Sequence, residues 1–224
     1  MIWSDYGYLL SKNKFGENSI IAEFFTENNG KVSGIIFGAT STKIKNFLFI
    51  GNLFNIQFNA KNPNRAGYFK VEIEKIFTPY YLEDKIKLNC ILYSLNLIKI
   101  LTVENQTNKK IFDQLYQLFE LFKSEDWIKK FICWELEMIK LVGYDINFLD
   151  YIDKNKMLNN ETYVPTFDGS KKIPSFLLRK NSSKTTNEEL KDGLKIVGDF
   201  LNKSVLIPNN INYPTSRNEF IKLI

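Results

Sequence analysis

The carboxylates are the side chains of this chain that could catalyse a reaction, and their spacing favours no catalytic site. No histidine occurs among the 224 residues, which removes the commonest general base and the commonest transition-metal ligand. Glu135 and Glu137 are two apart on an expected helix and fall on different faces, so we interpret them as solvated surface carboxylates. Magnesium-dependent nuclease or polymerase-like activity is the catalytic alternative, with these candidate ligands: Asp5, Glu17, Glu23 and Glu27.

The sequence contains no other motif of catalysis or metal binding. It has no glycine-rich phosphate loop before a helix and no Gly-x-Ser-x-Gly elbow. Cys90 and Cys133 are the only cysteines, and both fall in expected helices, so we predict reduced core residues and no zinc site. We therefore predict that the protein is not an enzyme and uses no cofactor.

Basic residues cluster in the first third of the chain, and phosphate binding depends on such local clustering. The net charge is +5, and residues 1–78 hold nine Lys and Arg against six Asp and Glu. The cations predicted to contact the phosphates of a nucleic acid are Lys12, Lys14, Lys31, Lys43, Lys45, Lys61 and Arg65. A lysine-rich surface that is only solvated is the alternative that the sequence leaves open.

Two phenylalanines adjoin these lysines. Single-stranded nucleic acid is held by a basic groove and by aromatic faces on which its bases stack. Phe15 follows Lys14 at a turn and is the candidate stacking residue, with burial in the core as its alternative. Phe37 ends a predicted strand, and we expect it in the core.

Strands and glycine turns between residues 8 and 39 must position these side chains. Turns are predicted at residues 15–18 and 27–30, where glycine supplies the positive φ of a tight turn. The strand between them alternates an apolar face with one that is only partly polar, as in a barrel with one functional face. Gly34 in the third strand is expected to mark a bulge or bend where the sheet curls to close.

Two further strands complete a five-stranded barrel. Residues 52–60 alternate apolar side chains with amides, and a turn at residues 61–67 leads into a fifth strand over residues 69–74. Residues 40–49 are expected to form a loop or a short helix. Five antiparallel strands with a longer third connection fit an OB-fold, whose face and loops often hold nucleic acid.

The chain after Thr78-Pro79 is expected to be mainly helical, which makes the protein α+β. We place an OB-fold domain at residues 1–78 and a helical domain at residues 79–224, with an irregular insert near residues 155–183. Predicted helices cover residues 82–103 and 108–123.

Capping residues predict where the later helices begin. Ser124 is expected to cap a helix that ends at Gly143. Capping boxes that begin at Thr186 and Ser216 are expected to open the last two helices.

No targeting segment is predicted. The N-terminus lacks a basic region followed by an apolar run, and the most hydrophobic stretch, residues 91–101, is interrupted by polar side chains. We therefore expect a soluble cytoplasmic protein.

Several of these motifs together resemble a known family. The amino-terminal signature of the bacterial DNA repair protein RecO family is similar to Leu9-Leu10, to residues 15–19 and 26–31, and to Gly38-Ala39. Residues 134–144 resemble the family's helix that ends in a Gly-Tyr step. The opening residues 3–8 are similar to its α-proteobacterial branch, and the resemblance covers most of the chain.

The resemblance implies an OB domain on a helical domain and a non-enzymatic recombination mediator of the RecF pathway. It implies that complementary strands are annealed and that RecA is loaded with the help of RecR. The implied partners are single- and double-stranded DNA, RecR, and the acidic tail of single-strand-binding protein, which the helical domain would bind.

The chain departs from the family pattern at two places. Many members carry a four-cysteine zinc motif after the Gly-Tyr helix, but residues 151–175 contain no cysteine, so no metal is expected. The family's Gly-Ala-Arg element is Gly38-Ala39-Thr40 here, which leaves Lys43 and Lys45 as the nearest carriers of phosphate contact. An OB-fold adaptor that binds RNA or protein is the alternative function.

Overall fold

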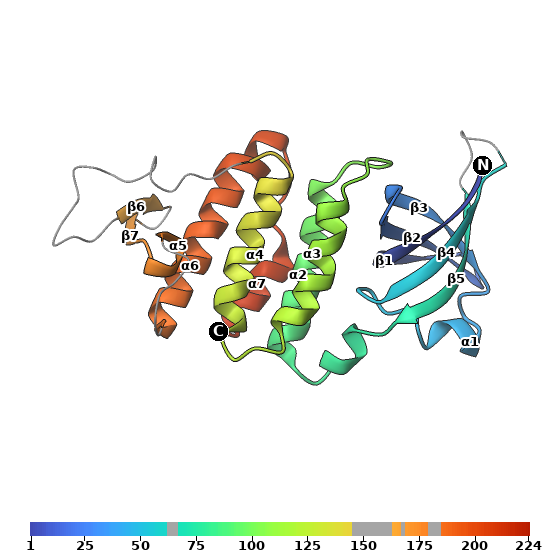
Figure 1. The fold of residues 1–224 in the computed structure, drawn as a ribbon, viewed down its shortest axis with the longest axis horizontal. Helices are drawn as coiled ribbons and strands as arrows, with labels where there is room; N and C mark the ends of the chain where they lie inside the picture. The colour runs from blue at the N-terminus through green and yellow to red at the C-terminus, as the bar shows by residue number, and fades with distance from the viewer. Residues whose placement is uncertain (62–66, 145–162, 167–168, 179–184) are drawn as a thin grey trace. The chain divides into compact units, whose positions relative to one another are not determined.

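Five strands at the N-terminus close into a barrel in the computed structural model, which describes residues 1–61, 67–144, 163–166, 169–178 and 185–224 (Figure 1). The strands are β1 (Ile2–Phe15), β2 (Ser19–Thr26), β3 (Gly30–Phe37), β4 (Leu53–Asn59) and β5 (Tyr68–Lys75). Their order around the barrel is β1-β2-β3-β5-β4, and β3 pairs with β5 in parallel while the other neighbours are antiparallel. The predicted fold class, an OB-fold barrel followed by helices, is confirmed.

β1 is long enough to pair with two strands. Residues 2–8 pair with β4, and residues 7–15 pair with β2, so β1 joins the two sides of the barrel. The sequence pattern indicated only its second half. The two predicted turns are confirmed, with Gly16 at φ 67° and Gly30 at φ 68°.

A one-residue bulge at Leu10 decides which side chains of β1 face inward. Leu9 pairs with Phe24 and Ser11 with Glu23, so Leu10 is an extra residue. Strand side chains alternate between faces, and the bulge therefore reverses the alternation after Leu9. Without it, the odd-numbered residues from Ser11 onward would face inward.

Of the bulge or bend that we expected at Gly34, the bulge is absent. The pairing of β2 with β3 runs without a shift across Gly34. A Cβ atom at this position would lie 2.7 Å from the ring of Phe69, which is buried. The glycine is therefore needed because an aromatic ring of β5 lies directly against β3 where the barrel closes.

The barrel core is built from the apolar faces that the alternation predicted. Its fully buried members include Leu9, Phe24, Phe54, Ile56 and Phe69. Phe24 makes edge-to-face contacts with the rings of Phe54 and Phe69, at centroid distances of 5.7 and 5.1 Å.

The chain divides into two compact units, residues 1–119 with Leu223 and residues 120–222 with Ile224. The first unit adds to the barrel a short helix α1 (Thr42–Lys45), a 3₁₀ turn (Thr78–Tyr81), α2 (Lys85–Leu101) and nearly all of α3 (Lys109–Leu121). Tyr8 packs against Phe77, just before the 3₁₀ turn, and against Phe112 of α3, which fixes these two segments to the barrel. The predicted domain boundary between residues 78 and 79 stays a prediction.

The second unit is mainly helical. It begins with α4 (Trp127–Leu141), a hairpin of β6 (Tyr163–Thr166) and β7 (Gly169–Lys172), and the short helix α5 (Ser175–Leu178). The helix α6 (Asn187–Phe200) follows and continues into a π-helical turn (Leu201–Leu206) and a 3₁₀ turn (Ile207–Asn209). The last helix is α7 (Thr215–Lys222). The predicted insert therefore holds a hairpin and a short helix; residues 155–162, Phe167, Asp168 and residues 179–183 lie outside the described residues.

The helix starts were predicted with mixed success. The capping box at Thr186 is confirmed, and Gly143 ends α4 at φ 100°. Ser124 does not cap α4, because the N-cap is Asp126. The box predicted at Ser216 is wrong because α7 begins one residue earlier, at Thr215, so that Ser216 lies inside the helix.

Two other expectations concern cysteines and membranes. Cys90 is buried as expected, but Cys133 is exposed, because it falls on the outward face of α4. None of the helices in the described ranges has the length and apolar character needed to cross a membrane.

Candidate nucleic-acid interface

The turn between β1 and β2 is tied to the segment that leaves β3 at one end of the barrel. The backbone N–H of Ala39 donates to the Asn18 carbonyl at 3.0 Å, and the Thr40 hydroxyl donates to the Asn18 side chain at 2.8 Å. Gly38, at φ 68°, makes the bend that allows this contact. We call this end of the barrel the rim.

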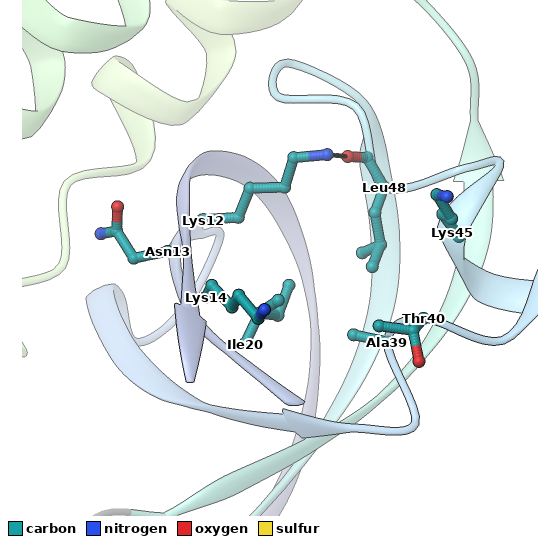
Figure 2. A pocket seen from close by; sticks show the side chains of 8 residues that line it. All are labelled: Lys12, Asn13, Lys14, Ile20, Ala39, Thr40, Lys45 and Leu48. Carbon is teal, nitrogen blue, oxygen red and sulfur yellow. Dashed lines mark hydrogen bonds between the residues drawn. The ribbon is translucent and has the colours of Figure 1, made fainter. Parts of the chain in front are cut away.

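A pocket of about 250 Å³ opens at the rim (Figure 2). Its floor is apolar and is formed by Ile20, Ala39 and Leu48, which belong to the barrel core or pack against it. Its polar lining comes from β1, from the exit of β3 and from α1: Lys12, Asn13, Lys14, Thr40 and Lys45. The structure therefore brings three of the predicted cations to one small apolar hollow.

The bulge in β1 places two of these lysines over the pocket. Lys12 and Lys14 pair with Ala22 and Ile20, so both project from the inner side of β1 where the barrel ends. Their stems can cover the end of the core while their ammonium groups reach toward water. Without the bulge, Ser11 and Asn13 would take the inward-facing positions of β1 instead.

The three pocket lysines differ in the hydrogen bonding and burial of their ammonium groups. The Lys12 ammonium donates to the Leu48 carbonyl across the pocket, and burial lowers its pKa (Figure 2). As whole residues, Lys12, Lys14 and Lys45 are all exposed, as is Lys43 beside them on α1, so that only the ammonium group of Lys12 is partly buried. Ile44 packs against the barrel core and so holds α1, with both of its lysines, at the rim.

Lys31 lies away from this pocket. Its ammonium donates to the carbonyls of Lys99 at 2.8 Å and Thr102 at 2.5 Å, at the C-terminal end of α2. Burial lowers its pKa, although the nearby Glu23 and Glu104 act in the opposite direction. Lys31 therefore joins the barrel to α2, where the helix dipole favours a cation.

The other two predicted cations do not join the pocket either. Lys61 is exposed after the end of β4 and does not line the pocket. Arg65 lies outside the described residues.

The two phenylalanines both reach the surface. Phe15 is exposed at the end of β1. Phe37, which we expected in the core, is 59% exposed because it stands opposite Ser19 on the outer face of β3.

The carboxylates of the barrel hold the structure together. Asp5 is buried and accepts hydrogen bonds of 2.8 to 2.9 Å from the backbone and side chain of Asn28 and from the side chain of Asn29, which fixes the turn between β2 and β3. Glu23 pairs with Lys99, and Glu27 pairs with Lys109. Among the described residues, no group of three or more Cys, Asp or Glu side chains is placed to hold a metal ion.

Glu135 is not the solvated surface carboxylate that we predicted. It is fully buried in the second unit and forms an ion pair with Arg217, whereas Glu137 is exposed. Helical spacing correctly separated the two glutamates, but it could not reveal a buried arginine 82 residues later in the chain.

Sequence reasoning also missed the floor of the pocket. Ala39 precedes the connecting segment predicted at residues 40–49 and Leu48 lies inside it, and nothing in their spacing indicates that they meet Ile20. The extra residue Leu10 was the available signal. Leu9, the core residue just before it, is odd-numbered, whereas the lysines after it are even-numbered, so a single unbroken alternation cannot put both on the inner face.

Two family models match nearly the whole chain. The one described as Recombination protein O N terminal matches residues 1–77, and the one described as Recombination protein O C terminal matches residues 82–210. Three similar proteins, each named DNA repair protein RecO, come from Rickettsia typhi, Wolbachia pipientis wMel and Rhodospirillum centenum. The Rickettsia typhi protein is 28% identical over 98% of this chain and 97% of its own length. The Wolbachia pipientis wMel protein is 24% identical over the full length of both chains. The Rhodospirillum centenum protein is 22% identical over 99% of this chain and 94% of its own length.

Proposed function

Because this chain belongs to the RecO family, we propose that it acts in DNA repair as a non-enzymatic recombination mediator that binds DNA at the rim of its barrel. The main structural support for this proposal is the pocket at the rim, where lysines from β1 and α1 surround an apolar floor. Phosphates would lie against the exposed ammonium groups, with Lys14, Lys43 and Lys45 as the main contacts and Lys12 at the back.

The mediator would anneal complementary strands and, with RecR, assist the loading of RecA in the RecF pathway. Its partners would be single- and double-stranded DNA, RecR and the acidic tail of single-strand-binding protein. A barrel surface that follows phosphates without reading bases suits this role, because annealing must proceed on any sequence. The role implies a cytoplasmic location.

An annealing assay tests the proposal. Complementary strands are coated with a bacterial single-strand-binding protein, and duplex formation is followed with and without this protein. We expect the protein to accelerate annealing. No acceleration, with RNA bound in preference to DNA of the same sequence, would support an RNA-binding adaptor instead.

A second measurement tests whether phosphates dominate the binding. The logarithm of the affinity for a single-stranded oligonucleotide should fall by roughly 0.7 per phosphate contact for each unit of log salt concentration. A salt-independent affinity would contradict the electrostatic part of the proposal. Labelled DNA incubated with the protein and Mg²⁺ should stay uncut.

A further inference from the structure

Five apolar side chains gather on the outer surface of the barrel beside the rim. We call them the outer patch: Phe15, Ile21, Ile35, Phe37 and Tyr68. Ile21 pairs with Ile35, which pairs with Tyr68 across the parallel closure, and Ser19 stands between Phe15 and Phe37. The patch therefore crosses β1, β2, β3 and β5 without a charged residue inside it.

The patch lies outside the core and faces solvent. Phe15 is 47% exposed, Ile21 39% and Phe37 59%. Their neighbours along β2 and β3, Ala22 and Ile36, point inward and are buried. The barrel core is thus already filled from the inner face, and the outer patch does not contribute to it.

Aromatic rings dominate the exposed part. The rings of Phe37 and Tyr68 are 5.9 Å apart between centroids and tilted by 54°. Phe15 lies two strand spacings from Phe37, roughly 10 Å across the sheet. Only Ser19 stands between them, and its small side chain leaves the ring faces within reach of a flat ligand.

The charges around the patch suit a polyanion. Lys70 is exposed two residues after Tyr68 and so lies on the same face of β5, and Lys14 precedes Phe15 at the rim. The next outward residue of β2 after Ile21 is Glu23, whose carboxylate is neutralised by Lys99 and accepts from the Ser11 hydroxyl. Two acidic neighbours remain exposed: Glu17 in the β1–β2 turn, and Glu72, which follows Lys70 on the outer face of β5.

We infer that the outer patch is a platform on which the bases of single-stranded DNA stack while the phosphates follow the lysines of the rim. This inference rests on the proposed function and names the part of DNA that the barrel holds besides phosphate. Aromatic rings accept any base, because every base has a π face, and a single strand leaves these faces open. Duplex DNA keeps its bases stacked on each other and would use only the lysines.

Ring-removing substitutions test the inference directly. The double variant Phe37→Ala and Tyr68→Ala should bind a single-stranded oligonucleotide about 5-fold more weakly or worse for each base that loses its platform. The slope of log affinity against log salt should stay unchanged, because no phosphate contact is lost. Affinity for a duplex of the same length should also stay unchanged.

Two further variants separate stacking from simple apolar contact. Phe37→Leu keeps apolar area but removes the ring, and it should weaken single-strand binding as Phe37→Ala does. Tyr80→Ala removes a tyrosine that is 78% exposed on the 3₁₀ turn, and it should bind as the unchanged protein does. Thermal unfolding of each variant confirms that the barrel is folded.

A fluorescent reporter gives an independent readout. In Phe37→Trp, stacking on a base should quench the new tryptophan on addition of single-stranded DNA and not on addition of duplex. If the unchanged protein binds DNA with normal salt dependence and no patch variant alters the binding, this inference is wrong and the proposed function stands. The patch would then suit a protein partner. Failure of the unchanged protein to bind DNA would instead overturn the proposed function.

Discussion

The guanidinium of Arg217 holds the carboxylate of Glu135 at two points inside the second unit. Nε lies 2.8 Å from Oε1 and Nη2 lies 3.0 Å from Oε2, and both side chains are buried. Nη2 also donates to the Leu194 carbonyl at 2.7 Å, and Nη1 donates to the Tyr213 hydroxyl at 2.8 Å. One arginine of α7 therefore links α4, α6 and the segment before α7.

Removing either partner of this ion pair should strongly destabilise the protein. Arg217→Leu leaves the Glu135 carboxylate buried without its ion-pair partner, which costs about 3–5 kcal/mol of unfolding free energy. Urea unfolding measures the loss. Replacing both partners by Leu should cost less than the sum of the single changes, because no uncompensated charge remains.

The exposed pair between Lys222 and Glu219 on the same helix is the control. Lys222→Ala should change the unfolding free energy by less than about 0.5 kcal/mol. If Arg217→Leu and Lys222→Ala lower the unfolding free energy equally, burial does not determine how much an ion pair contributes to stability.

Lys31 should act on stability rather than on DNA binding. Its ammonium binds two carbonyls at the end of α2, so Lys31→Met, which keeps the apolar stem, should cost roughly 1–2 kcal/mol. Its affinity for DNA at fixed salt should equal that of the unchanged protein. Normal stability with weakened DNA binding would instead return Lys31 to the DNA-binding surface.

The fold could be predicted where local patterns decide it. Alternation of apolar residues and two glycine turns determine the strands, and Thr186 with Glu189 determines the start of α6. The candidate site could be predicted only in part. Lys12, Lys14 and Lys45 were named from charge clustering, but their meeting depends on the bulge at Leu10 and on the path of the chain between β3 and β4.

Two of the failures concern burial. Phe37 was expected in the core because it is aromatic, yet β3 turns it outward. Glu135 was expected at the surface because it is charged, yet Arg217 compensates that charge in the core. The burial of Glu135 cannot be read from residues within one helical turn, whereas the polar Lys31 and Ser33, which share the outer face of β3 with Phe37, did indicate that face.

The two helix starts that have the same sequence pattern should respond differently to alanine. Thr186 accepts a hydrogen bond from the Glu189 N–H at 3.2 Å, so Thr186→Ala should cost about 1 kcal/mol of unfolding free energy. The Ser216 hydroxyl is buried and has no hydrogen-bond partner within the described residues. Ser216→Ala should therefore leave stability unchanged or raise it, because an unsatisfied polar group is removed. Equal losses in both variants would show that Ser216 does cap α7.

Glu23 should make the stability of the barrel depend on pH. Burial alone would raise the pKa of Glu23, but hydrogen bonds from Lys99 and Ser11 outweigh burial, and the pKa is lowered from its ordinary value of 4.5. A carboxylate with a lowered pKa in the folded state contributes stability above its ordinary pKa and loses it as the pH falls through the folded value. The difference in unfolding free energy between the unchanged protein and Glu23→Gln should therefore shrink below about pH 4.5. A difference that stays constant as the pH falls would contradict this role of Glu23.

The lysines of the rim should set the salt dependence of DNA binding. If Lys14 and Lys45 each contact one phosphate, the double variant Lys14→Ala and Lys45→Ala should reduce the slope of log affinity against log salt by roughly 1.4 for single strands. The loss should be the same for oligonucleotides of different sequence, because phosphate contacts carry no base information. Lys130→Ala and Lys222→Ala, which remove two exposed lysines of the second unit, form the control of equal charge and should leave the slope unchanged. A slope that falls equally in both double variants would mean that net charge alone, and not the rim, governs the affinity.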